Sequence, residues 1–66
     1  MRIIVNGAAR DVSAAADLAA ALRELGFGEA VVATAVNGEF VPVAARSTTG
    51  LAAGDQLEVL APMQGG

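Results

Sequence analysis

The chain ends in two glycines, Gly65 and Gly66, and these are the residues whose type and position best suit chemistry. Because glycine has no side chain, a terminal diglycine can enter a narrow channel and lets foreign backbone approach closely. The reactive group would then be the terminal carboxylate, placed in the active site of another protein. The same ending is also typical of a frayed or artificial terminus, since chain ends are commonly disordered. On the diglycine alone, the frayed or artificial terminus is the favoured interpretation.

Other side-chain chemistry is scarce. The 66 residues include no cysteine and no histidine, which excludes disulfides and the usual zinc sites. The seven acidic residues are dispersed and have no histidine to act with, so we expect a protein that is not an enzyme. The chain also lacks lysine, the acceptor of an isopeptide bond, which argues against a self-polymerising tag.

Size and charge narrow the partners. A chain of 66 residues forms one domain, and such a domain buries only about 60% of its unfolded surface. The net charge is −3 and the four arginines are scattered, so nucleic acid is not an expected partner. The apolar runs are too short to span a membrane, and the N-terminus lacks a signal-peptide core. We therefore expect a cytoplasmic protein with no membrane association.

Two Asn-Gly pairs, at 6–7 and 37–38, each predict a β-hairpin. The pair is favoured in a two-residue type I′ turn because both central residues need a positive φ. The first hairpin joins strands expected over 2–5 and 8–12. The second joins strands over 31–36 and 39–41, and Pro42 ends it or places it at a sheet edge.

Between the two hairpins, the spacing of the apolar residues changes from that of a strand to that of a helix. Leu18, Leu22 and Leu25 recur at helical spacing and predict one amphipathic helix. Asp17 is the preferred N-cap and Gly26 is placed to end the helix. Segment 44–51 reads as a connecting loop with room for one helical turn, and 56–61 reads as a last strand that Pro62 closes.

The element order ββαβββ predicts an α+β fold in which a single sheet of about five strands packs on one helix. Residues that alternate toward the helix are Ile3, Val5, Leu57 and Val59. Ile4 and Leu60 would then lie together on the opposite face, provided that the first and last strands are neighbours. They form a candidate docking face, although exposed aliphatic residues are also ordinary surface.

The order, the size and the ending together resemble the ThiS family, the sulfur carriers of thiamine biosynthesis. The resemblance covers essentially the whole chain, and the segments that carry it are Ile3–Gly7, the Leu18…Leu22…Leu25 helix, Ala35–Pro42, Leu51…Gly54–Leu60 and Pro62–Gly66. It implies a ubiquitin-like β-grasp fold with adjacent first and last strands. It also implies a single domain over 1–66, with 62–66 as a flexible C-terminal tail.

The resemblance further implies a chemistry for the tail. Gly66 would be the covalent site, adenylated by a ThiF-like adenylyltransferase that uses ATP. The acyl-adenylate would become a thiocarboxylate, with sulfur from a cysteine desulfurase or another persulfide donor. A ThiG-like thiazole synthase would receive this sulfur. Partners would recognise Gly65, Gln64 and Met63, and the chain itself would hold no stably bound cofactor.

Departures and alternatives accompany this resemblance. Many relatives carry a basic residue after the Val-Pro pair and an aromatic residue a few positions later, where this chain has Val43 and Arg46. The resemblance therefore does not extend to partner contacts of the 43–50 loop. Two alternative functions remain. The first is a sulfur carrier for molybdopterin or another sulfur-containing metabolite, and the second is a non-covalent β-grasp interaction module. The ending Gln64-Gly65-Gly66 favours the thiamine branch.

Overall fold

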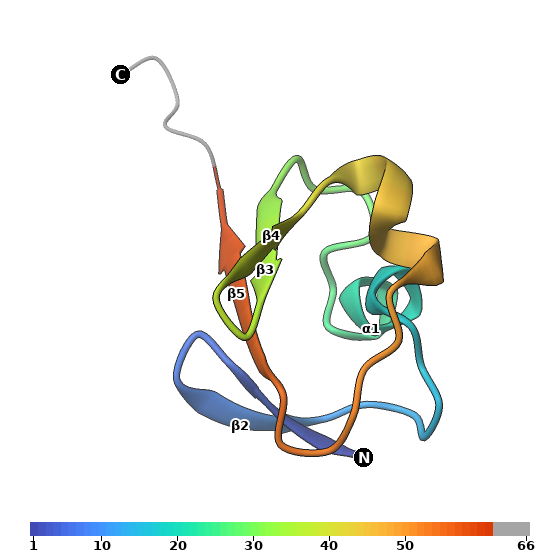
Figure 1. Ribbon diagram of the computed structural model, residues 1–66, viewed down its shortest axis with the longest axis vertical. Helices are drawn as coiled ribbons and strands as arrows, with labels where there is room; N and C mark the ends of the chain where they lie inside the picture. Colours follow the sequence, from blue (N-terminus) through green and yellow to red (C-terminus); the bar gives the residue numbers. More distant parts are fainter. Residues whose placement is uncertain (62–66) are drawn as a thin grey trace.

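The computed structural model describes residues 1–61, which form one sheet with its helices on one side (Figure 1). Its elements are β1 (Arg2–Val5), β2 (Ala8–Asp11), α1 (Leu18–Glu24), β3 (Ala33–Val36), β4 (Glu39–Val41), the 3₁₀ helix η1 (Val43–Thr48) and β5 (Gln56–Leu60). The predicted order ββαβββ is confirmed.

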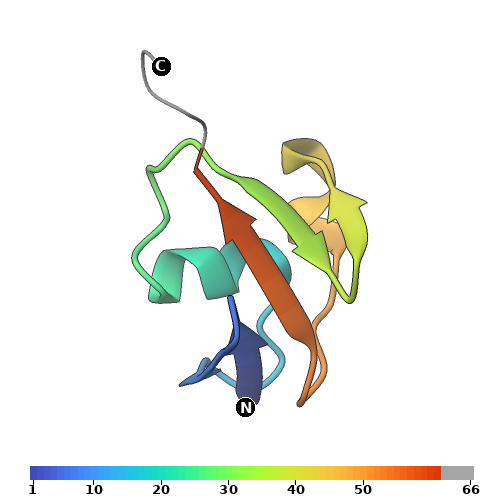
Figure 2. The ribbon, with the colours of Figure 1, turned by 90° about the vertical axis from the view of Figure 1, so that its left-hand side faces the viewer.

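The sheet has the strand order β2-β1-β5-β3-β4. β5 lies in the middle, between β1 and β3 (Figure 2). It runs parallel to β1 and antiparallel to β3, and the two hairpins β1–β2 and β3–β4 are antiparallel. The sheet is therefore mixed, and the expected adjacency of the first and last strands is confirmed.

Both Asn-Gly turns have the backbone that the sequence predicts. Asn6 and Gly7 have φ of 50° and 86°, and Asn37 and Gly38 have φ of 51° and 85°. These paired positive values are those of a type I′ turn. The strand bounds differ slightly from expectation, because β2 ends at Asp11, β3 begins at Ala33 rather than at residue 31, and β5 ends at Leu60.

α1 begins where its cap predicts. Asp17 is the N-cap, and its carboxylate accepts a hydrogen bond of 2.8 Å from the Ala20 N–H. Leu18, Ala21 and Leu22 are buried, and Gly26 follows the C-cap with a φ of 95°. The leucine stripe packs on the sheet face that carries Ile3, Val5, Leu57 and Val59, all of them buried as predicted.

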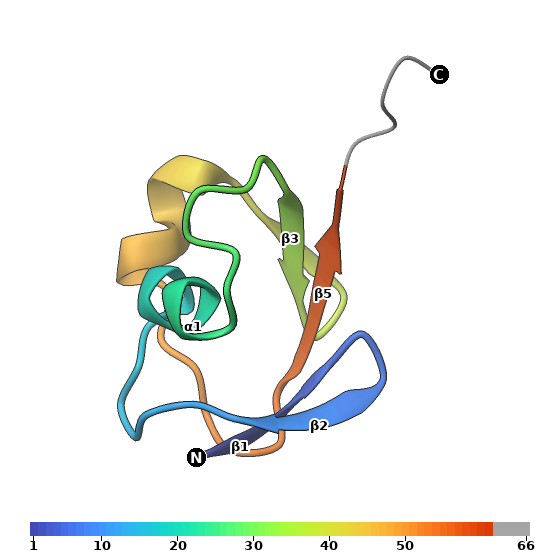
Figure 3. The ribbon, with the colours of Figure 1, turned by 180° about the vertical axis from the view of Figure 1, so that it is seen from behind.

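The segment expected to be a loop is largely the six-residue helix η1. η1 lies on the same side of the sheet as α1 and contacts it (Figure 3). The Arg46 guanidinium binds it to β3, donating through Nε to the Thr34 hydroxyl at 3.1 Å and through Nη2 to the Val32 carbonyl. Arg46 therefore has a structural role, because it holds η1 against the sheet.

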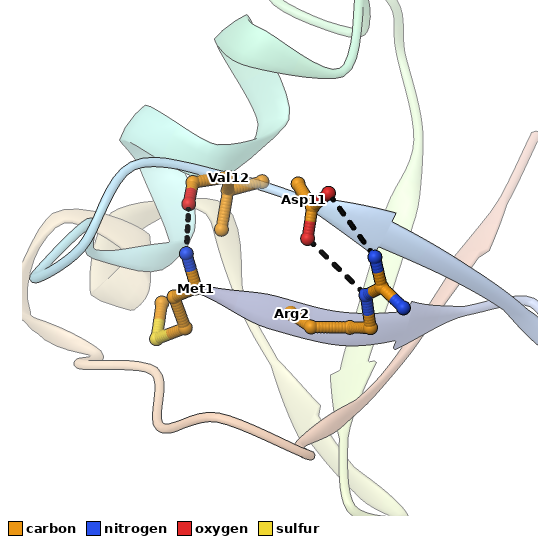
Figure 4. Close-up of polar contacts among 4 residues, drawn as sticks. All are labelled: Met1, Arg2, Asp11 and Val12. Atoms are coloured by element: carbon orange, nitrogen blue, oxygen red, sulfur yellow. Dashed lines mark hydrogen bonds and ion pairs between the residues drawn. The ribbon is translucent and has the colours of Figure 1, made fainter.

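Polar contacts close the outer end of the first hairpin (Figure 4). The Met1 ammonium donates to the Val12 carbonyl at 2.7 Å, and Arg2 and Asp11 form an ion pair at 3.3 Å. The hydrogen bond from Arg2, together with its charge, lowers the pKa of Asp11. Both side chains are 69% exposed, so water and salt screen this pair and its contribution to stability is small.

Candidate functional site

The site proposed from the sequence is the C-terminal segment, and the strand that leads to it is β5. Gly66, Gly65, Gln64 and Met63 lie outside the described residues, as does the predicted tail over 62–66. The described part of the site is therefore the C-terminal half of β5 with the sheet surface around it.

β5 is paired with β3 up to its last residue and with β1 over its first two residues. On one side Ile4 and Val5 of β1 pair with Gln56 and Leu57. On the other side β3 pairs with β5 from Val36–Leu57 to Ala33–Leu60. Leu57 and Val59 are 1% and 6% exposed, so the inward side chains of the strand are in the core. The strand is thus a firm support three residues before Met63.

The sheet surface that faces away from α1 is called the open face here, and its residues are Ile4, Ala35, Phe40, Glu58 and Leu60. Strand pairing places three of them in one row, since Phe40 lies opposite Ala35 and Ala35 opposite Glu58. Leu60 is 65% exposed and Phe40 is 69% exposed, whereas Ile4 is half-buried. Two large apolar side chains on one face favour contact with another protein.

Ile4 and Leu60 share the open face, as expected, but they are not side by side on it. Ile4 pairs with Gln56, and Leu60 is four residues farther along β5. At about 3.3 Å per residue, this places Leu60 roughly 13 Å along the strand from the position opposite Ile4. The sequence pattern predicts the face of each residue but not the register of the parallel pair.

Phe40 is the open-face residue that sequence reasoning missed. β4 has only three residues, and Val41, which follows Phe40 in this strand, is buried at 8% exposure. A strand this short gives too little alternation to decide which of two adjacent apolar residues points inward. The signal that was available is the composition, because Phe40 is one of only two aromatic residues in the chain.

Two asparagine side chains hold β5 near its two ends, and both come from the Asn-Gly turns. The Asn37 carboxamide accepts from the Gln56 N–H at 3.0 Å and donates to Asp55 at 3.1 Å. The Asn6 carboxamide accepts from the Val59 N–H at 2.8 Å and donates to the Val59 carbonyl at 3.0 Å. The turn residues therefore also fix the strand that leads to the C-terminus.

Asp55 fixes the turn that starts β5, and it should make the fold sensitive to acid. Its carboxylate accepts from the Ala52 N–H at 2.8 Å and from Asn37, and these bonds lower the pKa of Asp55. Because the pKa of Asp55 is lower in the folded chain than in the unfolded chain, the ionised carboxylate stabilises the fold. This stabilisation is complete at a pH above the unfolded-state pKa of about 3.9. It is lost as the pH falls through the folded-state pKa.

We expect an NMR titration of the Asp55 carboxyl to give a midpoint below that of an ordinary aspartate. The variant Asp55→Asn should show a weaker loss of stability between pH 5 and pH 2, about the range over which native carboxylates titrate. A midpoint at or above the ordinary value would contradict the role given to these hydrogen bonds.

The comparisons with known proteins bear on the whole chain. The model of the ThiS family matches residues 3–66. The chain belongs to the ThiS family. The match begins at the second residue of β1, covers all later described elements and runs to the terminal glycine. No curated protein sequence gives a significant match.

A solved ThiS structure is similar throughout. It is the crystal structure of the thiamine biosynthesis protein ThiS from Geobacter metallireducens, with 32% sequence identity and a TM-score of 0.83. The alignment covers 100% of both chains. The ubiquitin-like β-grasp fold that the resemblance implied is therefore confirmed. Within residues 1–61, no helix is long and apolar enough to cross a membrane.

Proposed function

We propose that the chain is a sulfur carrier of thiamine biosynthesis, whose Gly66 is adenylated by a ThiF-like adenylyltransferase and converted to a thiocarboxylate. A ThiG-like thiazole synthase then takes the sulfur. The observation that carries this proposal is the family match, because it includes the terminal diglycine as well as the globular part. The similar solved structure, named for thiamine biosynthesis and matched end to end, supports the same pathway.

The chemistry explains why such a carrier needs ATP. A carboxylate resists nucleophiles because of its negative charge and because oxide is a very poor leaving group. Attack of the Gly66 carboxylate on the α-phosphorus of ATP releases pyrophosphate and gives an acyl-adenylate. The terminal sulfur of a persulfide then bonds to the acyl carbon as the bond to AMP breaks. A second thiol reduces the resulting S–S bond, leaves the thiocarboxylate and is itself oxidised to a disulfide.

In this proposal the chain is a substrate, and its own residues supply position rather than catalysis. Residues 62–66, fully extended, would reach roughly 17 Å at about 3.4 Å per residue. That length suffices to join a docking surface to a buried nucleotide site. Glycine at 65 lets the backbone pass where a Cβ would collide. A cytoplasmic location belongs to the proposal, since both the ATP and the proposed partners are there.

The open face is the proposed docking surface for the adenylyltransferase. Ordering a tail costs about 1–2 kcal/mol per residue of backbone, so contacts of the rigid part have to offset this cost. Leu60 is the last residue of β5 and is 65% exposed, which places an apolar contact next to the tail. Phe40 adds a second apolar contact on the same face.

Intact-mass measurement tests the proposal. The full chain is incubated with ATP, a ThiF-like adenylyltransferase and sulfide, and it should gain the mass difference between sulfur and oxygen. Omission of ATP is the matched control and should leave the mass unchanged. A chain whose mass never changes is an interaction module instead. Transfer of the new sulfur to a ThiG-like synthase, and not to molybdopterin synthase, distinguishes the two carrier pathways.

A further inference from the structure

The Asn6 side chain makes a contact that its turn does not require. A type I′ turn needs a positive φ at this position, which glycine or aspartate also provides. Asn6 in addition joins both backbone polar groups of Val59, which is 53 residues away in sequence. The bonds are 2.8 Å and 3.0 Å long, so both have good hydrogen-bond lengths.

This contact replaces a missing piece of β-sheet. The parallel pairing of β1 with β5 ends at Val5 and Leu57, and the Asn6 N–H bonds the Leu57 carbonyl. After that the chain turns away through Gly7 into β2. A carboxamide carries the same donor and acceptor as a peptide group. The Asn6 side chain therefore acts as the next peptide of β1 and extends its pairing to Val59.

We propose that Asn6 is a positioning residue that fixes the point from which the C-terminal segment begins. The Asn6 side chain binds Val59, which is one residue before the end of β5. Without this contact, the β1 side of Val59 has no strand to pair with, so β3 alone holds the end of β5 and this end should open more readily. The number of residues that an activating enzyme has to order would then rise. The direction in which they leave the sheet would also vary more.

This inference rests on the proposed function, because it concerns delivery of Gly66 to the adenylating site. It predicts a defect in delivery rather than in docking. The open face would still bind the adenylyltransferase, while the terminal carboxylate would reach the nucleotide less often in the productive position. Small errors of placement cost large factors in rate.

Asn37 provides the matched control. It occupies the same position of the same turn type, with a φ of 51° against 50° for Asn6. Its side chain also makes two hydrogen bonds to the β5 region, but at Asp55 and Gln56, the far end of the strand. Asn6→Gly and Asn37→Gly therefore remove equal numbers of side-chain bonds from equivalent turns, and only the first acts next to the C-terminal segment.

Two measurements on the full chain test the inference. In Asn6→Gly, hydrogen exchange at the Val59 amide should be about five- to tenfold faster than in the wild type, after correction for global stability. In adenylation kinetics, the same variant should lose about tenfold in kcat with KM within about twofold. A purely structural loss would reduce the folded fraction, which raises the apparent KM and leaves kcat unchanged. Asn37→Gly should show only this raised apparent KM, with kcat unchanged.

Asn6→Asp is the second variant, because Asp-Gly also forms a type I′ turn. It keeps an acceptor for the Val59 N–H and loses the donor to the Val59 carbonyl, so it should lower kcat by less than Asn6→Gly does. Equal kcat values in Asn6→Gly and Asn37→Gly, or unchanged exchange at Val59, would overturn this inference alone. A wild-type chain that is never adenylated would overturn the proposed function together with it.

Discussion

A chain that ends at Gly65 should fold as the full chain does and yet gain no mass on incubation with ATP, adenylyltransferase and sulfide. Removal of Gly66 withdraws the carboxylate by one residue, about 3.4 Å along an extended chain. A displacement of about 1 Å in a reacting group can already cost roughly 100-fold in rate. We therefore expect charging to fall below detection, which is the largest effect on function that this chain offers.

The folding of the truncated chain is the control for this experiment. The buried core extends from Ile3 to Val59, so removal of residue 66 leaves it intact. The midpoint of chemical denaturation should accordingly match that of the full chain. If the truncated chain is still adenylated, then Gly66 is not the covalent site.

The parts of the fold that the sequence predicts well are those set by local chemistry. Asn-Gly at 6–7 and 37–38 dictates positive φ values, and both hairpins form there. Asp17 can cap orphan amides, and α1 starts directly after it. The pairing of β1 with β5 is a different case, because these strands are far apart in the sequence. No local pattern specifies it, and it was available only through the family resemblance.

The residues that sequence reasoning missed are those whose role depends on distant partners. Phe40 is exposed because Val41 faces the core, a choice that three residues of β4 do not reveal. The sequence of η1 has no apolar residues at helical spacing that would predict it. Arg46 holds η1 in place by hydrogen bonds to Thr34 and Val32. Asn6 looks complete as a turn residue, yet it also pairs with Val59. Such dual roles arise from the register of strands that are far apart in sequence.

The substitution Leu60→Glu should weaken binding to the adenylyltransferase about ten- to a hundredfold and leave folding nearly unchanged. Full burial of a leucine side chain contributes about 1.5–3 kcal/mol, and a buried carboxylate adds a desolvation cost. Each 1.4 kcal/mol is a factor of ten in the dissociation constant. The stability should shift by no more than about 0.5 kcal/mol, because Leu60 is 65% exposed in the free chain.

Val43→Glu is the control for the charge change, because Val43 is 71% exposed and lines a hollow beside α1 on the other side of the sheet. The variant Leu60→Gln separates the two parts of the effect, since it removes the apolar contact without adding charge. If Leu60→Glu and Val43→Glu weaken binding equally, the loss reports net charge and the docking surface is not the open face. If only the Leu60 variants bind weakly, the same strand both presents the docking contact and leads to the reactive terminus. The length from Leu60 to Gly66 would then set how deep in the partner its nucleotide site can lie.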